Sequence, residues 1–207
     1  MGKLDSKVAI ITGAGGGIGQ AAARLFAAEG AKLMLVDLNE EALVTLAKSL
    51  GGNTAGYAVA DVSSVSDVQA YLKDTIEQFG RVDITLLNAG IEGRIASISD
   101  QTEEDFDRVM AINTRGVWLG LKYTMPIMAK NAGGSIVITS STAGIRAVPG
   151  LSPYIASKHA VNGMVKTACI ENGQYNVRIN ALAPGPVDNR MMRSLEEQLN
   201  PNDPEAL

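Results

Sequence analysis

The chain has 207 residues and a formal net charge of −4 at pH 7, and 46% of its residues are hydrophobic while 19% are charged. This composition is typical of a globular protein and excludes a disordered chain. The acidic balance argues against a nucleic-acid partner and no apolar run is long enough to cross a membrane, so we expect neither nucleic acid nor membrane as a partner.

Short apolar runs alternate with amphipathic helical patterns along the chain. We expect six strands, at residues 8–12, 32–37, 55–61, 82–90, 134–140 and 176–184. Helices are expected in the stretches between them, the best defined at residues 64–79, 103–128 and 153–172. Asn39 is the expected N-cap of the second helix, and Gly51 and Gly52 are expected to end it.

This βαβα rhythm predicts an α/β fold, in which helices cover both faces of a parallel sheet. We expect a Rossmann-like, doubly wound sheet in three layers (α/β/α) that forms a single domain over residues 1–207. The strand order would be 3-2-1-4-5-6. The first helix is expected to turn Ile18, Ala22, Leu25 and Phe26 toward the sheet.

The chain has one cysteine and one histidine. Cys169 lies in an apolar helical pattern, which predicts a buried structural thiol rather than a nucleophile. No carboxylates gather near His159 at ligand spacing, so we expect no metal site. The N-terminal sequence lacks the apolar core and cleavage site of a signal peptide, and the expected location is the cytoplasm.

Glycines are concentrated where the first strand is expected to turn into the first helix. In doubly wound folds this turn holds a pyrophosphate at the helix N-terminus, and small residues let backbone N–H groups approach the phosphate oxygens. The GxGxxG spacing fails when counted from Gly13, but from Gly17 it reads G-I-G-Q-A-A, with alanine acceptable in the third position. Any tight strand-to-helix turn also favours glycine, which is the alternative. The residues expected to line this turn are Gly13, Gly15, Gly16, Gly17, Ile18 and Gly19.

Asp37 ends the second expected strand, 20 residues after Gly17. A carboxylate at this place accepts hydrogen bonds from an adenosine ribose and repels a 2′-phosphate. No lysine or arginine lies between Gly13 and Gly19 or just after Asp37 to bind that phosphate, so NAD is the expected cofactor in preference to NADP. The alternative for Asp37 is an N-cap or turn aspartate before Asn39.

Tyr154 and Lys158 are four residues apart near the start of an expected helix, so their side chains point to one face. An ammonium about 4 Å from the phenol would stabilise the phenolate by roughly 3–4 kcal/mol, enough to lower the pKa of the tyrosine by two or three units. The pair would then exchange a proton near neutral pH. A half-exposed helix pair without catalytic function is the alternative meaning of this spacing.

Several further motifs occur together with this pair. They are T-G-x-x-x-G-I-G at residues 12–19, N-A-G at 88–90, Asn113, Ser141, Y-x-x-x-K at 154–158 and P-G at 184–185. Taken together and in this order, they resemble the classical short-chain dehydrogenase/reductase family, and the likeness covers essentially the whole chain. The resemblance implies an NAD(P)-dependent enzyme acting on CH–OH groups, which interconverts a secondary alcohol and a ketone by hydride transfer.

The resemblance also implies a role for each catalytic residue. Tyr154 would exchange a proton with the substrate oxygen, and Lys158 would hold the nicotinamide ribose and lower the pKa of the tyrosine. Ser141 would hydrogen-bond the substrate oxygen, with Ser140 only its neighbour. Asn113 would hold a water that links Lys158 to solvent, and its alternative is an ordinary helix asparagine.

Cofactor contacts are implied in the same way beyond the glycine turn. They would come from Asp37, Leu38, Asp61, Val62, Asn88, Ala89, Gly90, Tyr154, Lys158, Pro184, Gly185 and Val187. For Asp61 the alternative is the N-cap of the following helix. The chain departs from the family pattern at Leu87, where asparagine is frequent, and at Asn189, where threonine is usual.

The family normally continues past a mobile substrate loop, here beginning near residue 185, to another helix and a seventh strand. This chain stops earlier, although Asp203, Pro204 and Glu205 have the pattern of a helix start. A homo-oligomer, dimer or tetramer, is implied, and the short C-terminus is expected to alter it. The same shortness favours the alternative function, a cofactor-binding but catalytically weak protein or an assembly subunit. We expect substrate contacts from the apolar residues Ile145, Val148 and Leu151.

Overall fold

In the computed structural model, which describes residues 2–51 and 54–200, six parallel strands form one sheet. The strands are β1 (Val8–Thr12), β2 (Lys32–Asp37), β3 (Ala55–Val59), β4 (Ile84–Leu87), β5 (Gly134–Thr139) and β6 (Val177–Leu182). Their order across the sheet is β3-β2-β1-β4-β5-β6, as expected. The direction of winding reverses between β1 and β4, which is where ligands bind in open α/β sheets.

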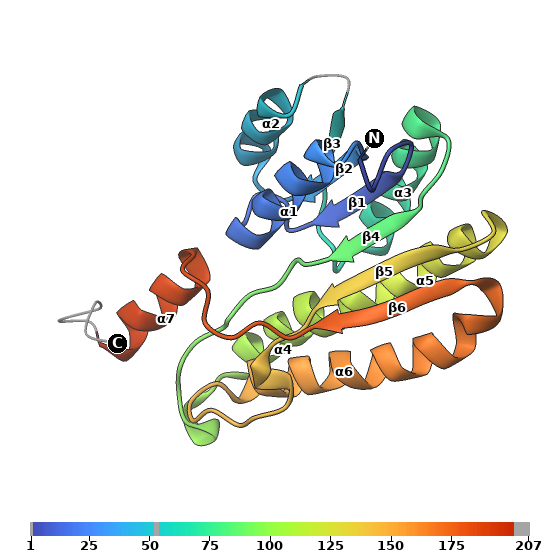
Figure 1. The fold of residues 1–207 in the computed structure, drawn as a ribbon. Coiled ribbons are helices and arrows are strands. Elements are labelled where there is room, and N and C mark those ends of the chain that lie inside the picture. The colour runs from blue at the N-terminus through green and yellow to red at the C-terminus, as the bar shows by residue number, and fades with distance from the viewer. Residues whose placement is uncertain (1, 52–53, 201–207) are drawn as a thin grey trace.

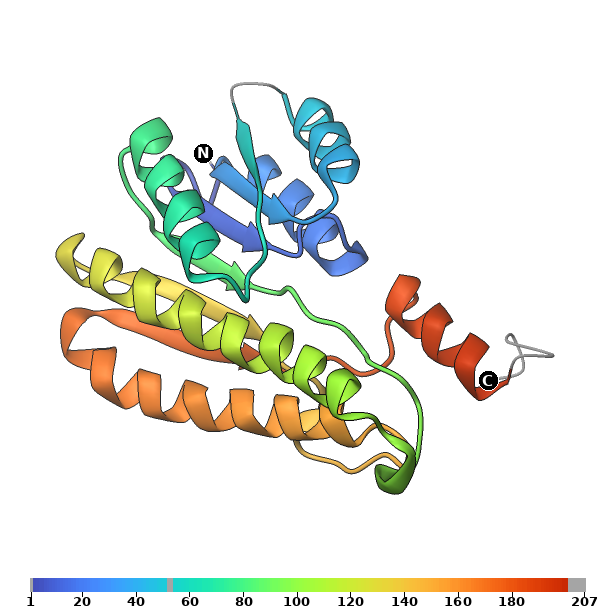
Figure 2. The same ribbon diagram turned by 180° about the vertical axis from the view of Figure 1, so that it is seen from behind.

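Helices cover both faces of this sheet (Figures 1 and 2). On one face lie α1 (Gly17–Ala28) and α2 (Glu40–Ser49). On the other face lie α3 (Val65–Phe79), α5 (Gly116–Lys130) and α6 (Ser152–Asn172), with α4 (Glu103–Met110) leading into α5. The predicted three-layer, doubly wound α/β fold is confirmed. A last helix, α7 (Arg190–Leu199), lies beyond the edge toward which the arrowheads of β4, β5 and β6 point in Figure 1.

Each face of the sheet has its own apolar core, because successive side chains of a strand point to opposite faces. In β1, Ile10 packs with α3, α5 and α6, while Ala9 and Ile11 pack with α1 and α2. Strands buried on both faces read as continuous apolar runs, and this made them recognisable in the sequence. Full burial of such side chains stabilises the fold by about 1.5–3 kcal/mol each.

Four of the strands end earlier than their sequence patterns predict. Strands expected to end at residues 61, 90, 140 and 184 end at Val59, Leu87, Thr139 and Leu182. The expected helix at 103–128 is also interrupted, by a π-helical turn at Ala111–Arg115 between α4 and α5. The residues released in these places include Asp61, Gly90 and Asn113, which the sequence assigns to the site.

Two expectations about burial are wrong. Leu25 is 60% exposed, because the inward face of α1 is formed by Gly19, Ala23 and the expected Ala22 and Phe26, and Leu25 lies to one side of it. Cys169 is also exposed, since Ala168 occupies the buried position one residue earlier on α6.

Asn39 is the N-cap of α2, as predicted, because its Oδ1 accepts a hydrogen bond from the Ala42 N–H at 3.0 Å. Gly51 follows the helix with φ +87°, as its predicted role in ending the helix requires. Gly52 and the expected helix start at Asp203 lie outside the described residues. Among the residues that are described, no helix is both long enough and apolar enough to cross a bilayer.

Candidate active site

The carboxyl ends of the six strands meet at one edge of the sheet because all pairings are parallel. The sequence-predicted cofactor residues follow these strand ends, so the fold brings them to the same edge. They are Gly13 to Gly19 after β1, Asp37 at the end of β2 and Leu38 after it, Asp61 and Val62 after β3, Asn88 to Gly90 after β4, and Pro184 to Val187 after β6. Ser141 follows β5, while α6 supplies Tyr154 and Lys158 and the π turn supplies Asn113.

Some glycines of the turn are packed against neighbouring backbone, and others are exposed to solvent. Gly13 has φ +65°, and a Cβ there would lie 2.8 Å from the Cα of Ala89, so a side chain is excluded. Gly16 and Gly17 are exposed, Gly16 is the N-cap of α1 without any side-chain cap hydrogen bond, and the first turn carries no acidic residue. A tight turn alone would explain Gly13 but not these open positions. The helix N-terminus therefore presents backbone N–H groups that fit an anion such as a pyrophosphate.

Thr12 connects the glycine turn to the end of β4, a role that the sequence did not reveal. The Thr12 Oγ1 accepts hydrogen bonds from the N–H groups of Asn88 (2.9 Å) and Ala89 (3.2 Å). The Asn88 amide in turn donates to the carbonyl oxygens of Thr12 and Gly13, both at 3.2 Å. The signal available in the sequence was a polar residue that ends an otherwise apolar strand. These bonds fix the two strand ends on either side of the point where the winding reverses.

Asp37 lies beside the glycine turn. Its Oδ2 accepts from the Gly15 N–H at 2.9 Å, and its Oδ1 accepts from the Asn39 N–H at 3.0 Å. The alternative interpretation of Asp37, an N-cap or turn aspartate, is correct for the turn. The N-cap of α2 is Asn39. Leu38, the next residue, is 66% exposed.

The alternative for Asp61 is wrong, because the N-cap of α3 is Ser64. The Asp61 carboxylate instead accepts hydrogen bonds from the N–H and the hydroxyl of Ser63, both at 2.8 Å. Val62 packs against Gly116, where an added Cβ would approach Val62 Cγ2 to 2.9 Å. Asp61 and Val62 both lie at the carboxyl edge of the sheet, where residues that contact the cofactor would have to lie.

Lys158 is connected to the glycine turn through β5. It is 3% exposed, and its Nζ donates to the Thr139 carbonyl oxygen at 2.8 Å. The Thr139 hydroxyl donates to Oδ1 of Asn88 at 3.0 Å, and Asn88 binds the turn as described above. Burial lowers the pKa of Lys158 to about 8. The ammonium form therefore still predominates at neutral pH.

The phenol of Tyr154 lies on the same side of α6, with the Lys158 Nζ 5.5 Å from its ring centroid. The expected lowering of its pKa is not found. Burial raises the pKa of Tyr154, and this outweighs a hydrogen bond from Ser141, which lowers it, while the negative charge of Glu92 raises it further. Desolvation of the phenolate thus dominates in this structure, and the phenol keeps its proton.

Ser141 and Ser140 have different partners. Ser141 hydrogen-bonds Tyr154, and its Oγ also accepts from the Ala143 N–H at 3.1 Å. Ser140 is buried, and its hydroxyl donates to Asn162 Oδ1 at 2.8 Å. The structure therefore places Ser141 next to the phenol, whereas the hydroxyl of Ser140 is bonded to Asn162.

Asn113 is fully buried in the π-helical turn, which contradicts the alternative of an ordinary helix asparagine. Its Oδ1 accepts from the Ile91 N–H and its Nδ2 donates to the Ile91 carbonyl oxygen, both at 2.8 Å, and Nδ2 also donates to Ser157 Oγ at 3.1 Å. A Cβ added to Gly90 would lie 3.1 Å from the Asn113 Oδ1 and 3.6 Å from the Lys158 Nζ. A side chain on Gly90 would therefore press against Asn113 and contact Lys158.

Comparison with known proteins decides the family. The sequence profile described as short chain dehydrogenase matches residues 7–200 of this chain. The chain belongs to the short-chain dehydrogenase family. Levodione reductase of Leifsonia aquatica is 42% identical over 207 residues, covering 98% of this chain and 77% of that protein.

Solved structures agree with this assignment. The crystal structure of levodione reductase superposes with a TM-score of 0.94 at 41% identity, covering 98% of this chain and 80% of that one. The NAD+-bound xylitol dehydrogenase superposes with a TM-score of 0.90 at 36% identity, covering 96% of this chain and 78% of that one. As a short-chain dehydrogenase, the protein is an oxidoreductase that acts on CH–OH groups.

One charged pair in this short-chain dehydrogenase was missed by sequence reasoning. Glu92 is only 7% exposed, and its carboxylate is paired with the guanidinium of Arg190 at 3.3 Å. The sequence offered one signal for Glu92, a carboxylate within the mostly apolar stretch that follows the N-A-G motif. The sequence offered no signal for Arg190, because it lies 98 positions after Glu92.

The segment after β6 leads from the site to α7. The Pro184 carbonyl oxygen accepts from the Thr142 N–H at 2.9 Å, whereas Gly185 and Val187 are exposed. Asn189 is the N-cap of α7 and also lies against Gly17, where a Cβ would come within 3.1 Å of the Asn189 Cβ.

The apolar residues expected to meet substrate differ in exposure. Ile145 and Val148 are exposed, but Leu151 is buried and is not available for that contact.

Proposed function

We propose that this dehydrogenase interconverts a secondary alcohol and a ketone with NAD as cofactor and Tyr154 as the acid and base. The observation that carries the proposal is the position of one phenol. Tyr154 lies beside Ser141 and Lys158, and hydrogen bonds through Thr139 and Asn88 link Lys158 to the glycine turn. A proton-exchanging group and an anion-binding helix terminus thus belong to the same edge of the sheet.

The residues present fit a dinucleotide. The uncapped N-terminus of α1 with its exposed Gly16 and Gly17 would hold the pyrophosphate, and the carboxylate of Asp37 would hold the adenosine ribose. The negative charge of Asp37 beside the turn supports NAD over NADP, because it would repel a 2′-phosphate. When bound, NAD supplies the acceptor for the two electrons and the hydrogen that leave the alcohol carbon.

The remaining cofactor contacts are carried by residues at the ends of the other strands. We assign them to Gly13, Gly15, Ile18, Gly19, Leu38, Asp61, Val62, Asn88, Ala89, Gly90, Pro184, Gly185 and Val187, together with Tyr154 and Lys158. All of them follow a strand of the sheet or lie on α1 or α6, which supports this assignment.

The residues around the substrate oxygen have separate tasks. Tyr154 gives its proton to a ketone oxygen or takes the proton of an alcohol, and Ser141 hydrogen-bonds that oxygen. The ammonium of Lys158 stabilises the phenolate that forms when Tyr154 has given up its proton. The nearness of Asn113 and Lys158, both of which approach Gly90, supports the proposed water that links Lys158 to solvent. Because burial raises the pKa of Tyr154, the phenol is protonated before the reaction and can act as the acid.

The homo-oligomer and the cytoplasmic location expected from the sequence are part of the same proposal. A homo-oligomer would cover apolar side chains that are exposed here, such as Trp118 on α5 (48%) and Ile170 on α6 (84%). Sedimentation velocity would test the homo-oligomer, because a protein that sediments as a monomer at all concentrations contradicts it.

A direct assay tests the proposed function. The protein is mixed with NAD and a panel of secondary alcohols, and with NADH and the corresponding ketones, and NADH absorbance is followed. We expect turnover with at least one pair and weaker turnover with NADP. Binding of NAD without turnover of any pair would contradict the proposal and favour a catalytically weak cofactor-binding protein.

A further inference from the structure

Asn162 lies on α6 in line with Tyr154 and Lys158. It follows Lys158 by four residues and Tyr154 by eight, and side chains four residues apart lie on the same side of a helix. This side of α6 therefore presents a phenol, an ammonium and an amide in succession. The proposed function gives a role to the phenol and the ammonium but none to the amide.

The amide of Asn162 bonds to the chain on both sides of Ser141. Its Oδ1 accepts from the Ser140 hydroxyl at 2.8 Å, and its Nδ2 donates to the Gly144 carbonyl oxygen at 3.0 Å. A carbonyl oxygen can only accept, so these partners fix the orientation of the amide. Because Ser140 and Gly144 are both buried, removal of the amide would leave buried polar groups without a partner, which is unfavourable.

The turn that follows Ser141 lies very close to α6 at Gly144. A Cβ added to Gly144 would lie 2.6 Å from the Asn162 Nδ2, 2.9 Å from the Ser140 Oγ and 3.0 Å from the Lys158 carbonyl oxygen. Only a residue without a side chain lets the turn come so near to the helix. The Asn162 amide is thus enclosed between the turn and α6.

Within this turn, backbone groups fix the side chain of Ser141. The Ser141 Oγ accepts from the Ala143 N–H at 3.1 Å, and the Ser141 carbonyl oxygen accepts from the Gly144 N–H at 2.9 Å. On the other side of the turn, the Thr142 N–H donates to the Pro184 carbonyl oxygen at 2.9 Å. The segment after β6 therefore holds one side of the turn, and α6 holds the other.

We propose that Asn162 is a positioning residue that holds the Ser141 hydroxyl at a fixed place relative to Tyr154. Its two hydrogen bonds tie the residues on either side of Ser141 to the helix that carries the phenol. Both side chains must reach the same substrate oxygen, and a misplacement of about 1 Å can cost about a hundredfold in rate. The effect on catalysis rests on the proposed function, whereas the effect on the position of Ser141 does not.

Hydrogen exchange of individual amides, followed by NMR, tests the positioning without any turnover. Asn162→Leu keeps the approximate size of the side chain and removes both hydrogen bonds. We expect the amides of Ala143 and Gly144, which bind Ser141, to exchange about tenfold faster or more in this variant. Their rates are compared with that of the Ile136 amide in the centre of β5, which reports the opening of the whole sheet.

Asn172→Leu is the matched control, because Asn172 is a buried asparagine at the other end of α6. Its Nδ2 donates to the Ala168 carbonyl oxygen at 3.0 Å, so this substitution also removes a hydrogen bond from the helix. We expect it to leave both kcat and the relative exchange of residues 143 and 144 as in the wild type. Wild-type exchange in Asn162→Leu, or equal acceleration in both variants, would overturn the proposal.

A double-variant cycle shows whether the amide acts through Ser141. With NAD and an alcohol that is turned over, Asn162→Leu should lower kcat about tenfold and leave the Kd of NAD unchanged. In a Ser141→Ala background the same substitution should lower kcat no further, because the hydroxyl that it displaces is already absent. Equal losses in the two backgrounds, or no loss in either, would overturn the proposal.

Ser140→Ala takes the place of Asn162→Leu if the latter does not fold. It removes the hydroxyl that donates to the Asn162 Oδ1, and it should accelerate exchange of the same two amides, whereas unchanged exchange would overturn the proposal. Faster exchange in a protein that turns over no alcohol would refute the proposed function but support this inference. Turnover that depends on Tyr154, together with wild-type exchange in the variant, would refute this inference alone.

Discussion

Replacing Lys158 by methionine separates the catalytic value of this side chain from its effect on stability. Lys158 is almost fully buried, and burial lowers its pKa from 10.5 to about 8. Below that value the folded protein holds a charge that water would solvate better, which lowers the free energy of unfolding. Lys158→Met keeps the length of the side chain and removes the charge. We therefore expect a variant that is more stable than the wild type and inactive.

The magnitude follows from the two pKa values. Because the folded-state pKa is the lower one, the unfolded chain binds more protons between about pH 8 and 10.5, and stability rises with pH through this window. The buried charge costs about 3 kcal/mol at pH 7 and about 1 kcal/mol at pH 10. Between these conditions the wild type should gain about 2 kcal/mol relative to Lys158→Met. At pH 7 the variant should be about 2 kcal/mol more stable, after about 1 kcal/mol is subtracted for the lost hydrogen bond to Thr139.

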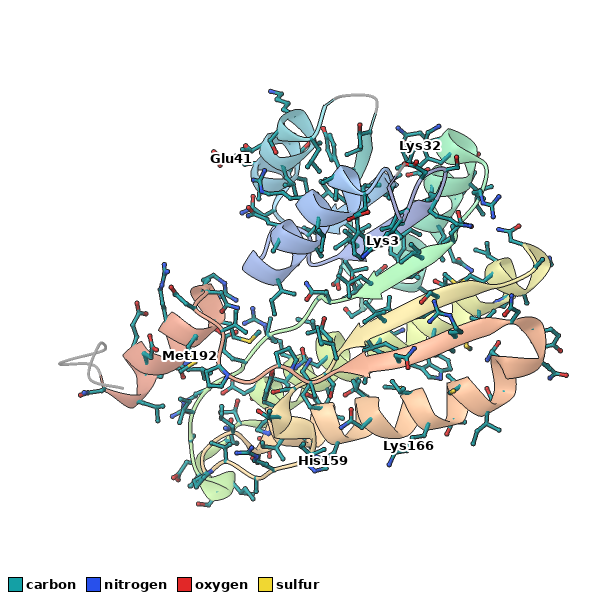
Figure 3. The ribbon with its side chains drawn as sticks, viewed as in Figure 1. Lys3, Lys32, Glu41, His159, Lys166 and Met192 are labelled. Carbon is teal, nitrogen blue, oxygen red and sulfur yellow. The ribbon has the colours of Figure 1, made fainter. Side chains whose placement is uncertain are left out.

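Urea unfolding followed by circular dichroism at both pH values is the assay, with dehydrogenase activity measured in parallel. Lys166→Met is the matched control, since Lys166 lies on the same helix and is exposed (Figure 3). Its stability should change with pH in parallel with the wild type. If the stability of Lys158→Met also changed in parallel with the wild type, burial of the ammonium would not cost what this reasoning requires.

Two further predictions concern the cofactor and the space beside Lys158. Asp37→Asn keeps an acceptor for the Gly15 N–H but removes the negative charge, so the ratio of kcat/KM with NAD to that with NADP should fall about tenfold or more. An unchanged ratio would show that Asp37 only builds the turn. Gly90→Ala places a methyl group 3.1 Å from Asn113 Oδ1 and 3.6 Å from Lys158 Nζ, so kcat should fall while the protein stays folded. Gly163→Ala is the control, because its Cβ meets nothing within 4 Å, and a Gly90→Ala variant as active as this control would show that the space is not used.

Most of the fold could be predicted from the sequence because the inner strands β1, β2 and β4 are largely buried on both faces and read as apolar runs. The ends of the strands could not be predicted from the sequence, and β4 shows why. Its pattern suggests a strand to residue 90, but the N–H groups of Asn88 and Ala89 bind the Thr12 hydroxyl instead of a neighbouring strand. Cys169 shows a second limit: an apolar helical pattern does not say which of two adjacent residues, here Ala168 or Cys169, faces the core.

The site could be predicted where a motif places residues on neighbouring strand ends, as it does for Ser141 and Asn88. It could not be predicted where a long-range contact or burial decides the chemistry. The pairing of Glu92 with Arg190 depends on how α7 returns to the site. The spacing of Tyr154 and Lys158 suggested a lowered pKa for the phenol, but desolvation, which spacing does not report, reverses the direction.

The central claim is that one phenol exchanges the proton of the reaction. The most direct test compares Tyr154→Phe with Tyr175→Phe, which alters an exposed tyrosine elsewhere, and measures NAD binding and alcohol-dependent NADH formation in both. We predict that Tyr154→Phe binds NAD like the wild type but loses about a hundredfold or more in kcat, whereas Tyr175→Phe keeps full activity. Wild-type turnover in Tyr154→Phe would contradict the account.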